Sequence, residues 1–203
     1  MSLFPRKPSA GNRLQSDAGG VFVDEAFLAH FQVEASKATV ASTTGIHAAV
    51  TDTGAQVVVT TGITQPSVAR NITATAGGTA GDIRAIQVVI AGTNEAGAAI
   101  TETLPAFTVD TPGTVTGSKA FKTVTSITIP AHDGVGATTA IGFGEKLGLP
   151  HKLAHNTVLV AFADNAKEGT APTVAVSASA VESNTVDLNS ALNSKVVDVY
   201  YLV

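Results

Sequence analysis

IRAIQVVIAGTNEAGAAITETL, at residues 83–104, consists of two runs rich in β-branched residues on either side of a turn segment, GTNEAG, at 92–97. Gly and Asn supply the positive φ angles that a hairpin loop needs. Ile86, Val88 and Ile90 alternate with other residues, so they lie on one face of an extended strand. The stretch therefore predicts an antiparallel β-hairpin with one buried face.

The same composition of Thr, Val, Ile, Ala and Gly continues through residues 66–150, and short strands recur to the end of the chain. Their spacing of roughly 8 to 12 residues is typical of a β-sandwich. No long helical periodicity is present. We therefore predict an all-β fold: an antiparallel β-sandwich or barrel-like body with an extended N-terminal arm. Besides the hairpin, strands are expected at 56–61, 71–75, 114–116, 123–129, 138–143, 157–162, 173–180, 185–188 and 196–202.

Three segments are expected along the chain. Residues 1–33 form the N-terminal arm and anchor, residues 34–150 the main β domain, and residues 151–203 C-terminal strands that make a second layer or a small lobe. The boundary is placed at 148–150 (Gly-Leu-Pro), because a proline after a glycine-rich run ends strand pairing.

The N-terminal arm divides into two parts. Residues 1–20 hold two prolines and three glycines but few apolar residues, so they do not bury enough surface to fold alone. Residues 21–33 hold three of the 8 phenylalanines, and the acidic pair Asp24-Glu25 is able to start a short helix there. We expect this second part to dock on its own body or on a neighbouring subunit. The residues predicted to make inter-subunit contacts are Arg6, Lys7, Arg13, Phe22, Phe27 and Phe31.

Composition limits the class of function. Charged residues are 14% of the chain, against roughly 25% in an average protein. Either neighbours cover much of the surface, or the surface is polar without charge through Thr, Ser and Gly. The formal net charge of −4 argues against a general nucleic-acid-binding role. With no cysteine, the fold does not depend on an oxidising compartment, and no segment has the roughly 18–20 apolar residues of a membrane span.

The sequence contains no recognisable reaction centre. His151 and His155 have a spacing that suits a metal pair on a helix, but Pro150 predicts a loop there and a third ligand is missing. No Gly-x-Ser-x-Gly motif occurs. The absence of Trp, with Tyr200 and Tyr201 adjacent in one strand, leaves little aromatic surface for stacking sugars. We therefore expect no catalytic residue, no cofactor and no metal.

The block 65–149 resembles a group of bacteriophage and prophage virion structural proteins. The resemblance lies in four phrases: QPSVARNITATA, DIRAIQVVIAGTNEAGAAITETL, GSKAFKTVTSITIP and GATTAIGFGEKLGLP. It covers a little under half of the chain and carries no catalytic residues. It implies a protein present in many copies on a particle, on either the head or the tail.

From this resemblance we expect a non-enzymatic virion protein that assembles in the host bacterial cytoplasm. A capsid decoration (cement) protein is favoured, because an arm attached to a compact β body suits the bridging of capsid subunits. Its expected partners are the major capsid protein and copies of itself, as a homo-oligomer such as a trimer, with no specific nucleic acid and no membrane. Two alternatives stay open: a tail tube, neck or minor tail protein, for which the 83–104 hairpin is short, and a carbohydrate-binding adhesion module.

Overall fold

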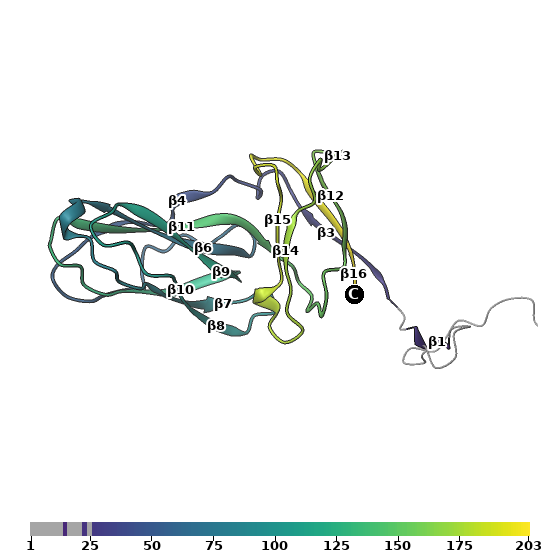
Figure 1. The fold of residues 1–203 in the computed structure, drawn as a ribbon, viewed down its shortest axis with the longest axis horizontal. Helices are drawn as coiled ribbons and strands as arrows, with labels where there is room; N and C mark the ends of the chain where they lie inside the picture. The colour runs from purple at the N-terminus through teal and green to yellow at the C-terminus, as the bar shows by residue number, and fades with distance from the viewer. Residues whose placement is uncertain (1–13, 16–21, 24–25) are drawn as a thin grey trace, which may run out of the picture.

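A computed structural model describes residues 14–15, 22–23 and 26–203, with side chains described from residue 26 onward. Every strand pairing among these residues is antiparallel, and one of the sheets curls into a half-barrel. The all-β prediction is confirmed. The body is elongated, with a large lobe and a small lobe along its long axis (Figure 1).

The described strands range from 2 residues in β1 to 12 in β11 and are joined by loops and two single 3-10 turns. In chain order they are β1 Leu14–Gln15, β2 Phe22–Val23, β3 Leu28–Val33, β4 Ser42–Thr51, β5 Val57–Val59, β6 Arg70–Gly78, η1 Ala80–Asp82, β7 Val89–Thr93, β8 Ala99–Thr103, β9 Gly113–Phe121, β10 Thr123–Ile129, β11 Ala137–Gly148, β12 Val158–Ala163, β13 Ala166–Lys167, β14 Thr173–Ala175, η2 Val181–Ser183, β15 Thr185–Asp187 and β16 Val197–Leu202.

The strands form four sheets. Two of them, β5-β10-β7-β8 and β14-β15-β11-β6-β9, supply the large lobe, with β4 pairing on β11. The third sheet, β13-β12-β16-β3, covers the small lobe, and β1 and β2 form a fourth, in which neither pairs with any other described strand. β14 and β15 extend the six-stranded sheet into the small lobe (Figure 1).

The predicted hairpin is present as β7 and β8, which pair from Val89 opposite Thr103 to Thr93 opposite Ala99. Its turn is closed by Asn94, whose side-chain oxygen accepts the backbone N–H of Ala98. Pairing begins at Val89 and not at residue 83, although the alternating apolar residues before it are buried as predicted. The apolar pattern thus fixed the buried face more accurately than the strand boundary.

The first third of the chain differs from the sequence analysis in two respects. Residues 28–33 form a strand and not the short helix that Asp24-Glu25 is able to start, because β3 pairs along its whole length with β16, from Leu28 opposite Leu202 to Val33 opposite Val197. The strand β4 was not predicted at all. Its sequence, STTGIHAAVT, has little apolar alternation, and only Ile46 is fully buried, so pairing with β11 holds it in place.

Two hydrophobic cores correspond to the two lobes. The first contains Ile72, Ile90 and Phe121 and lies between the two large-lobe sheets. The second contains Leu149 and Tyr201 and lies under the sheet β13-β12-β16-β3. β11 enters both cores, since its Ile141 belongs to the first core and its Leu147 to the second.

A buried arginine marks the passage of β11 from one core to the other. The register between β11 and β6 shifts between Phe143 and Leu147. Arg70 is fully buried there: its Nε donates to the carbonyl of Gly144 (2.9 Å), one terminal nitrogen donates to the Thr39 hydroxyl (3.1 Å), and its guanidinium carbon lies 4.4 Å from the centre of the Phe143 ring. Burial lowers the pKa of Arg70 to about 10.

Candidate interaction surface

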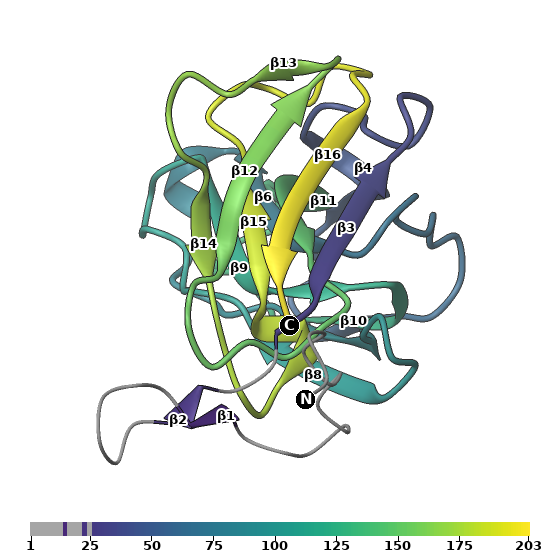
Figure 2. The same cartoon turned by 90° about the vertical axis from the view of Figure 1, so that its right-hand side faces the viewer.

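The outward face of the sheet β13-β12-β16-β3, which we call the outer face, is the candidate functional surface. Side chains alternate across a strand, so Val197, Val199 and Tyr201 of β16 point into the small-lobe core, while Asp198 and Tyr200 point outward. Figure 2 looks onto this face, with β12, β16 and β3 side by side. No described strand or turn covers it there.

A row of polar and aromatic side chains crosses the middle of the outer face. The Asp198 carboxylate accepts a hydrogen bond from the Gln32 amide (2.8 Å) and lies 2.7 Å from Nε2 of His30. The His30 ring stacks on Tyr200, with centroids 4.6 Å apart and planes 6° apart. Phe162 meets Tyr200 from the other side, at 6.1 Å and 89°. A hollow of about 420 Å³ lies over this row.

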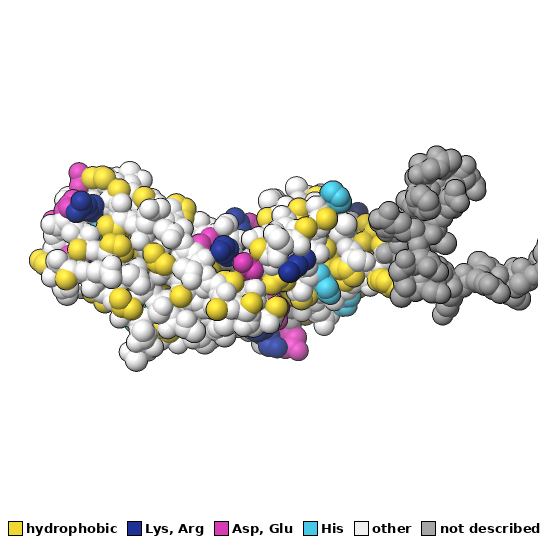
Figure 3. Space-filling view, turned by 90° about the horizontal axis from the view of Figure 1, so that it is seen from below, with side chains coloured by type: hydrophobic (Ala, Val, Ile, Leu, Met, Phe, Trp, Pro, Cys, Tyr) yellow, Lys and Arg dark blue, Asp and Glu magenta, His cyan; other side chains and the backbone are white. Residues whose placement is uncertain are grey.

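Four large apolar side chains are exposed at one end of this sheet, Leu28 and Leu159 on its outer face and Phe27 and Val203 on the opposite side by strand alternation; we call them the end patch. Phe27 is 61% exposed, Leu28 63%, Leu159 60% and Val203 41%. Phe27 and Val203 exchange both backbone hydrogen bonds, and Leu28 lies opposite Leu202. Figure 3 shows hydrophobic side chains collected at this end of the small lobe, where the continuously described chain begins at Ala26.

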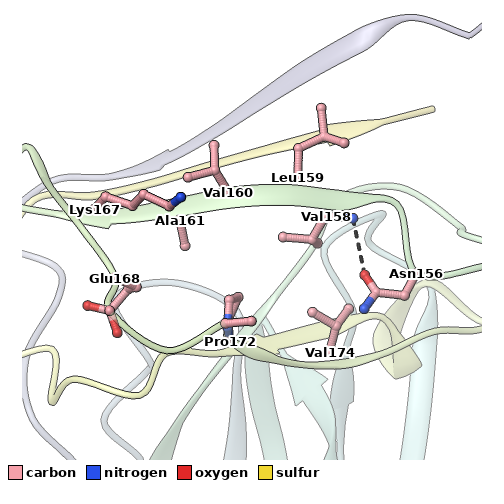
Figure 4. Close-up of a pocket in the computed structure, with 11 residues that line it drawn as sticks. Asn156, Val158, Leu159, Val160, Ala161, Lys167, Glu168, Pro172 and Val174 are labelled. Atoms are coloured by element: carbon pink, nitrogen blue, oxygen red, sulfur yellow. Dashed lines mark hydrogen bonds between the residues drawn. The ribbon is translucent and has the colours of Figure 1, made fainter.

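A bulge in β12 brings Leu159 onto the outer face. The register between β12 and β16 shifts between Val158 and Val160, so that two neighbouring residues face the same side. Leu159 and Val160 both point away from the cleft drawn in Figure 4, whereas Ala161 points into it. The bulge thus adds one apolar side chain to the end patch.

A cleft of about 260 Å³ lies beside the outer face, between β12 and the segment that carries β14 (Figure 4). Val158 and Ala161 face it from one wall, and Pro172 and Val174 face it from the other. Lys167 and Glu168, of opposite charge, stand at one end. Apolar side chains therefore face each other across the cleft, while polar groups make up a comparable share of its surface. The cleft is smaller than the roughly 300–1,000 Å³ of most small-molecule sites.

The predicted contact residues differ in where they lie: outside the described residues, on the surface, or against the small-lobe core. Arg6, Lys7 and Arg13 lie outside the described residues, and Phe22 is described only by its backbone, in β2. Phe27 is in the end patch. Phe31 points inward from β3, opposite Val199, and packs against the small-lobe core. One of the two phenylalanines with a described side chain is thus available to a partner, and the other is largely used by its own chain.

Sequence reasoning missed the outer face itself. The signal was present in VDVYYLV at 197–203, where alternation puts Asp198 and Tyr200 on the side opposite Tyr201. Their partners on β3, His30 and Gln32, are 166 to 168 residues away in the sequence. Nothing in the sequence predicted that the anchor segment and the last strand are neighbours.

Two further histidines, His151 and His132, are engaged in the fold. His151 Nδ1 is 2.6 Å from the Tyr201 hydroxyl, and burial raises the pKa of Tyr201 to about 12. His132 is buried: its Nδ1 accepts the backbone N–H of Arg84 (3.1 Å) and its Nε2 lies 2.9 Å from the Thr139 hydroxyl. Desolvation lowers the pKa of His132, against smaller opposing effects of Asp52 and Asp133.

Across the described ranges, no three His, Cys, Asp or Glu side chains are grouped so that they could hold a metal ion. In the same part of the chain, no helix is long and apolar enough to cross a membrane. Comparisons of the chain with protein-family models, curated proteins and solved structures find no match.

Proposed function

We propose that the chain is a virion structural protein, and that it acts as a capsid decoration protein. The observation that carries the proposal is the end patch, an exposed apolar surface at the point where the described chain begins. Large apolar side chains gathered on a surface mark sites of protein–protein contact. The resemblance of residues 65–149 to phage virion proteins supplies the class of partner.

The energetics fit attachment to a lattice. Each large apolar side chain contributes roughly 1.5–3 kcal/mol when it moves from full exposure to full burial. Much of that gain is offset by the loss of translational and rotational freedom on binding. One copy would therefore bind a capsid weakly through the end patch alone. Connected copies gain avidity because the second contact becomes intramolecular.

In this proposal the partners are the major capsid protein and further copies of this chain. The body supplies a stable scaffold, and the end patch supplies the attachment to the head. The net charge of −4 and the low content of Lys and Arg fit contact with protein better than contact with DNA.

The arrangement of Tyr200 bears on the carbohydrate-binding alternative. A sugar platform needs an accessible aromatic face, but His30 stacks on Tyr200 and Phe162 adjoins it. Tyr201 is fully buried. A decoration role is therefore the better proposal for this surface, and micromolar binding in a glycan screen would reverse that preference.

The test is immunogold labelling of intact virions with an antibody to this chain, viewed by electron microscopy. Label spread over the head is the expected result. Label along the tail or at its end would replace decoration with the tail alternative. The hairpin β7–β8, with five residues in each strand, would then have to be considered as a ring-forming element.

A further inference from the structure

The cleft beside β12 has two walls that are free strand edges. On the side away from β16, β12 is paired only at Phe162 and Ala163, by the two-residue strand β13. Val158–Val160 have no partner strand on that side among the described residues. β14 is the last strand of its sheet and pairs only with β15. The Val158 N–H donates to the Asn156 side chain and the Ala161 carbonyl accepts the Glu168 N–H, so the part of β12 open to an added extended segment lies between these two residues, opposite the free edge of β14.

The size and lining of the cleft suit a short apolar segment. Its facing side chains are aliphatic (Val158, Ala161, Val174) or proline (Pro172), and the partly buried Val158 and Val174 belong to the margin of the small-lobe core. The volume of about 260 Å³ has room for very few side chains. Extended peptides bind such edges with main-chain hydrogen bonds for affinity and side-chain pockets for specificity.

We propose that Leu3 and Phe4 of a second copy of this chain occupy the cleft between β12 and β14. They are the only large apolar residues between Ser2 and Arg13. Pro5 follows them, and proline favours an extended backbone in the residue before it. Lys167 and Glu168 give the end of the cleft no net charge, so the apolar pair, and not Arg6 or Lys7, is the anchor.

The length of the N-terminal segment allows exchange between copies. Phe4 precedes Ala26 by 22 residues, which span at most about 70 Å when fully extended. The strands β1 and β2 within this segment pair with each other and with no other described strand. A separate two-stranded sheet is only marginally stable in water and gains from a neighbour. A second copy provides both that neighbour and the free strand edges.

Such a contact joins copies head to tail. The segment of one copy enters the cleft of the next, which leaves one free segment and one free cleft until the ring closes. A closed ring gives the homo-oligomer expected for the chain, and a trimer is the smallest ring with a threefold axis. The inference deepens the proposed function, in which copies of the chain are one of the partners. Its test uses purified protein without virions, so the two proposals fail separately.

The first experiment is a mixing test on full-length chains, read by native mass spectrometry. One variant carries Leu3→Asp and Phe4→Asp; the other carries Val174→Asp. Each alone should self-associate about tenfold more weakly than the parent chain or worse, which is about 1.4 kcal/mol or more. Mixed together, they should form a 1:1 complex, because the mixture retains one intact segment and one intact cleft. A parent chain that is monomeric at high concentration, or a mixture without the complex, overturns the proposal.

Controls separate cleft binding from misfolding. Val176→Asp changes the same residue type just beyond β14 but outside the cleft lining, so it should leave association unchanged. Pro172→Asp is a second cleft variant at a residue outside the small-lobe core, for use if Val174→Asp does not fold. Equal loss of association in the Val176 and Pro172 variants would count against the cleft as the contact site.

The second experiment uses the absence of cysteine in this chain. A chain carrying Phe4→Cys and Val174→Cys should form disulfide-linked dimers and larger species on non-reducing gels. The pair Phe4→Cys and Val109→Cys, with Val109 exposed on the large lobe, should not. If the protein forms the disulfide but migrates as a monomer, the segment binds the cleft of its own chain. If no disulfide forms, the segment does not bind in the cleft. Either result overturns exchange between copies.

Discussion

The large and small lobes bury their cores in different ways. In the large lobe, two sheets enclose the core between them. In the small lobe, the sheet β13-β12-β16-β3 covers the core with one face and leaves the other face open. The end patch and the cleft both belong to this lobe. If the proposed function holds, the small lobe makes the attachment while the large lobe is built around an enclosed core.

The largest expected effect concerns the joint between the lobes. Arg70→Ala removes the side chain that ties β6 to the β11 carbonyl at Gly144 and leaves a cavity beside Phe143. We expect a loss of about 3–4 kcal/mol in the free energy of unfolding, as for other large-to-small core changes. Urea unfolding followed by circular dichroism measures it.

A matched control is Arg84→Ala on the surface. Arg84 forms an exposed ion pair with Asp133 at 3.4 Å, and such pairs contribute about 0–1 kcal/mol. If Arg70→Ala costs no more than Arg84→Ala, the buried arginine does not join the two cores. Two separate transitions in the Arg70 variant would mean that the lobes unfold independently once the joint is lost.

The second prediction sharpens the assignment of attachment to the small lobe. Leu159→Asp places a charge in the end patch, and Val135→Asp places one at a residue of similar exposure on the large lobe, 66% against 60%. We expect Leu159→Asp to weaken binding to particles that lack the protein by about tenfold or more, or about 1.4 kcal/mol. Val135→Asp should bind as the parent does. Co-sedimentation measures both, and equal binding by the two variants would contradict the role of the end patch.

The sequence predicted the strands well where their apolar residues alternate. The strand β10 was predicted with its exact bounds at 123–129, and β16 to within one residue. β4 was missed because its neighbour β11, and not its own composition, holds it in the sheet. The segment after Asp24 forms the strand β3 and not a helix, because pairing with β16 outweighs the local helix-start signal. Local propensity is a weak guide where a long-range partner is available.

The candidate surface was harder to predict than the fold, for the same physical reason. Phe27 was identified because an exposed phenylalanine needs a cover, and that reasoning used only local sequence. Asp198 and His30 meet only after the chain has folded, so no local pattern joins them. The cleft is equally non-local, since Ala161 and Val174 belong to different sheets. Long-range pairings decide both.

The third prediction concerns the stability of the small lobe at alkaline pH. Tyr201 has a folded-state pKa of about 12, raised by burial, against 10.0 in the unfolded chain. Between about pH 10 and 12 the unfolded state releases the phenol proton and the folded state keeps it, so stability falls as pH rises. Tyr201→Phe should cost about 1 kcal/mol at neutral pH through loss of the His151 hydrogen bond. It should also remove this part of the alkaline loss.

Thermal unfolding of the parent chain and of Tyr201→Phe from pH 8 to 11 checks this prediction. Tyr200→Phe serves as the control at the adjacent, outward-facing residue. If Tyr201→Phe loses stability between pH 10 and 11 as steeply as the parent chain, the buried phenol is not the group that titrates. If Tyr200→Phe flattens the curve instead, the assignment of the two tyrosines to opposite faces is wrong.

The fourth prediction, with the smallest expected effect, concerns the stability of the large lobe in mild acid. His132 stacks on Phe107 of the large-lobe core, and its Nδ1 accepts the Arg84 N–H. Burial favours its neutral form. Its folded-state pKa lies below the 6.5 of the unfolded chain. As pH falls below about 6.5, the imidazole takes up a proton in the unfolded state but not in the folded state, so the free energy of unfolding falls. His132→Gln should be less stable than the parent at pH 7 but should lose less stability between pH 7 and pH 5, measured by urea midpoints.

The control is His155→Gln, at an exposed residue, which should keep the dependence of stability on pH seen in the parent chain. An unchanged slope in His132→Gln would assign the acid sensitivity to other groups, and the contrast of an alkali-sensitive small lobe with an acid-sensitive large lobe would no longer hold.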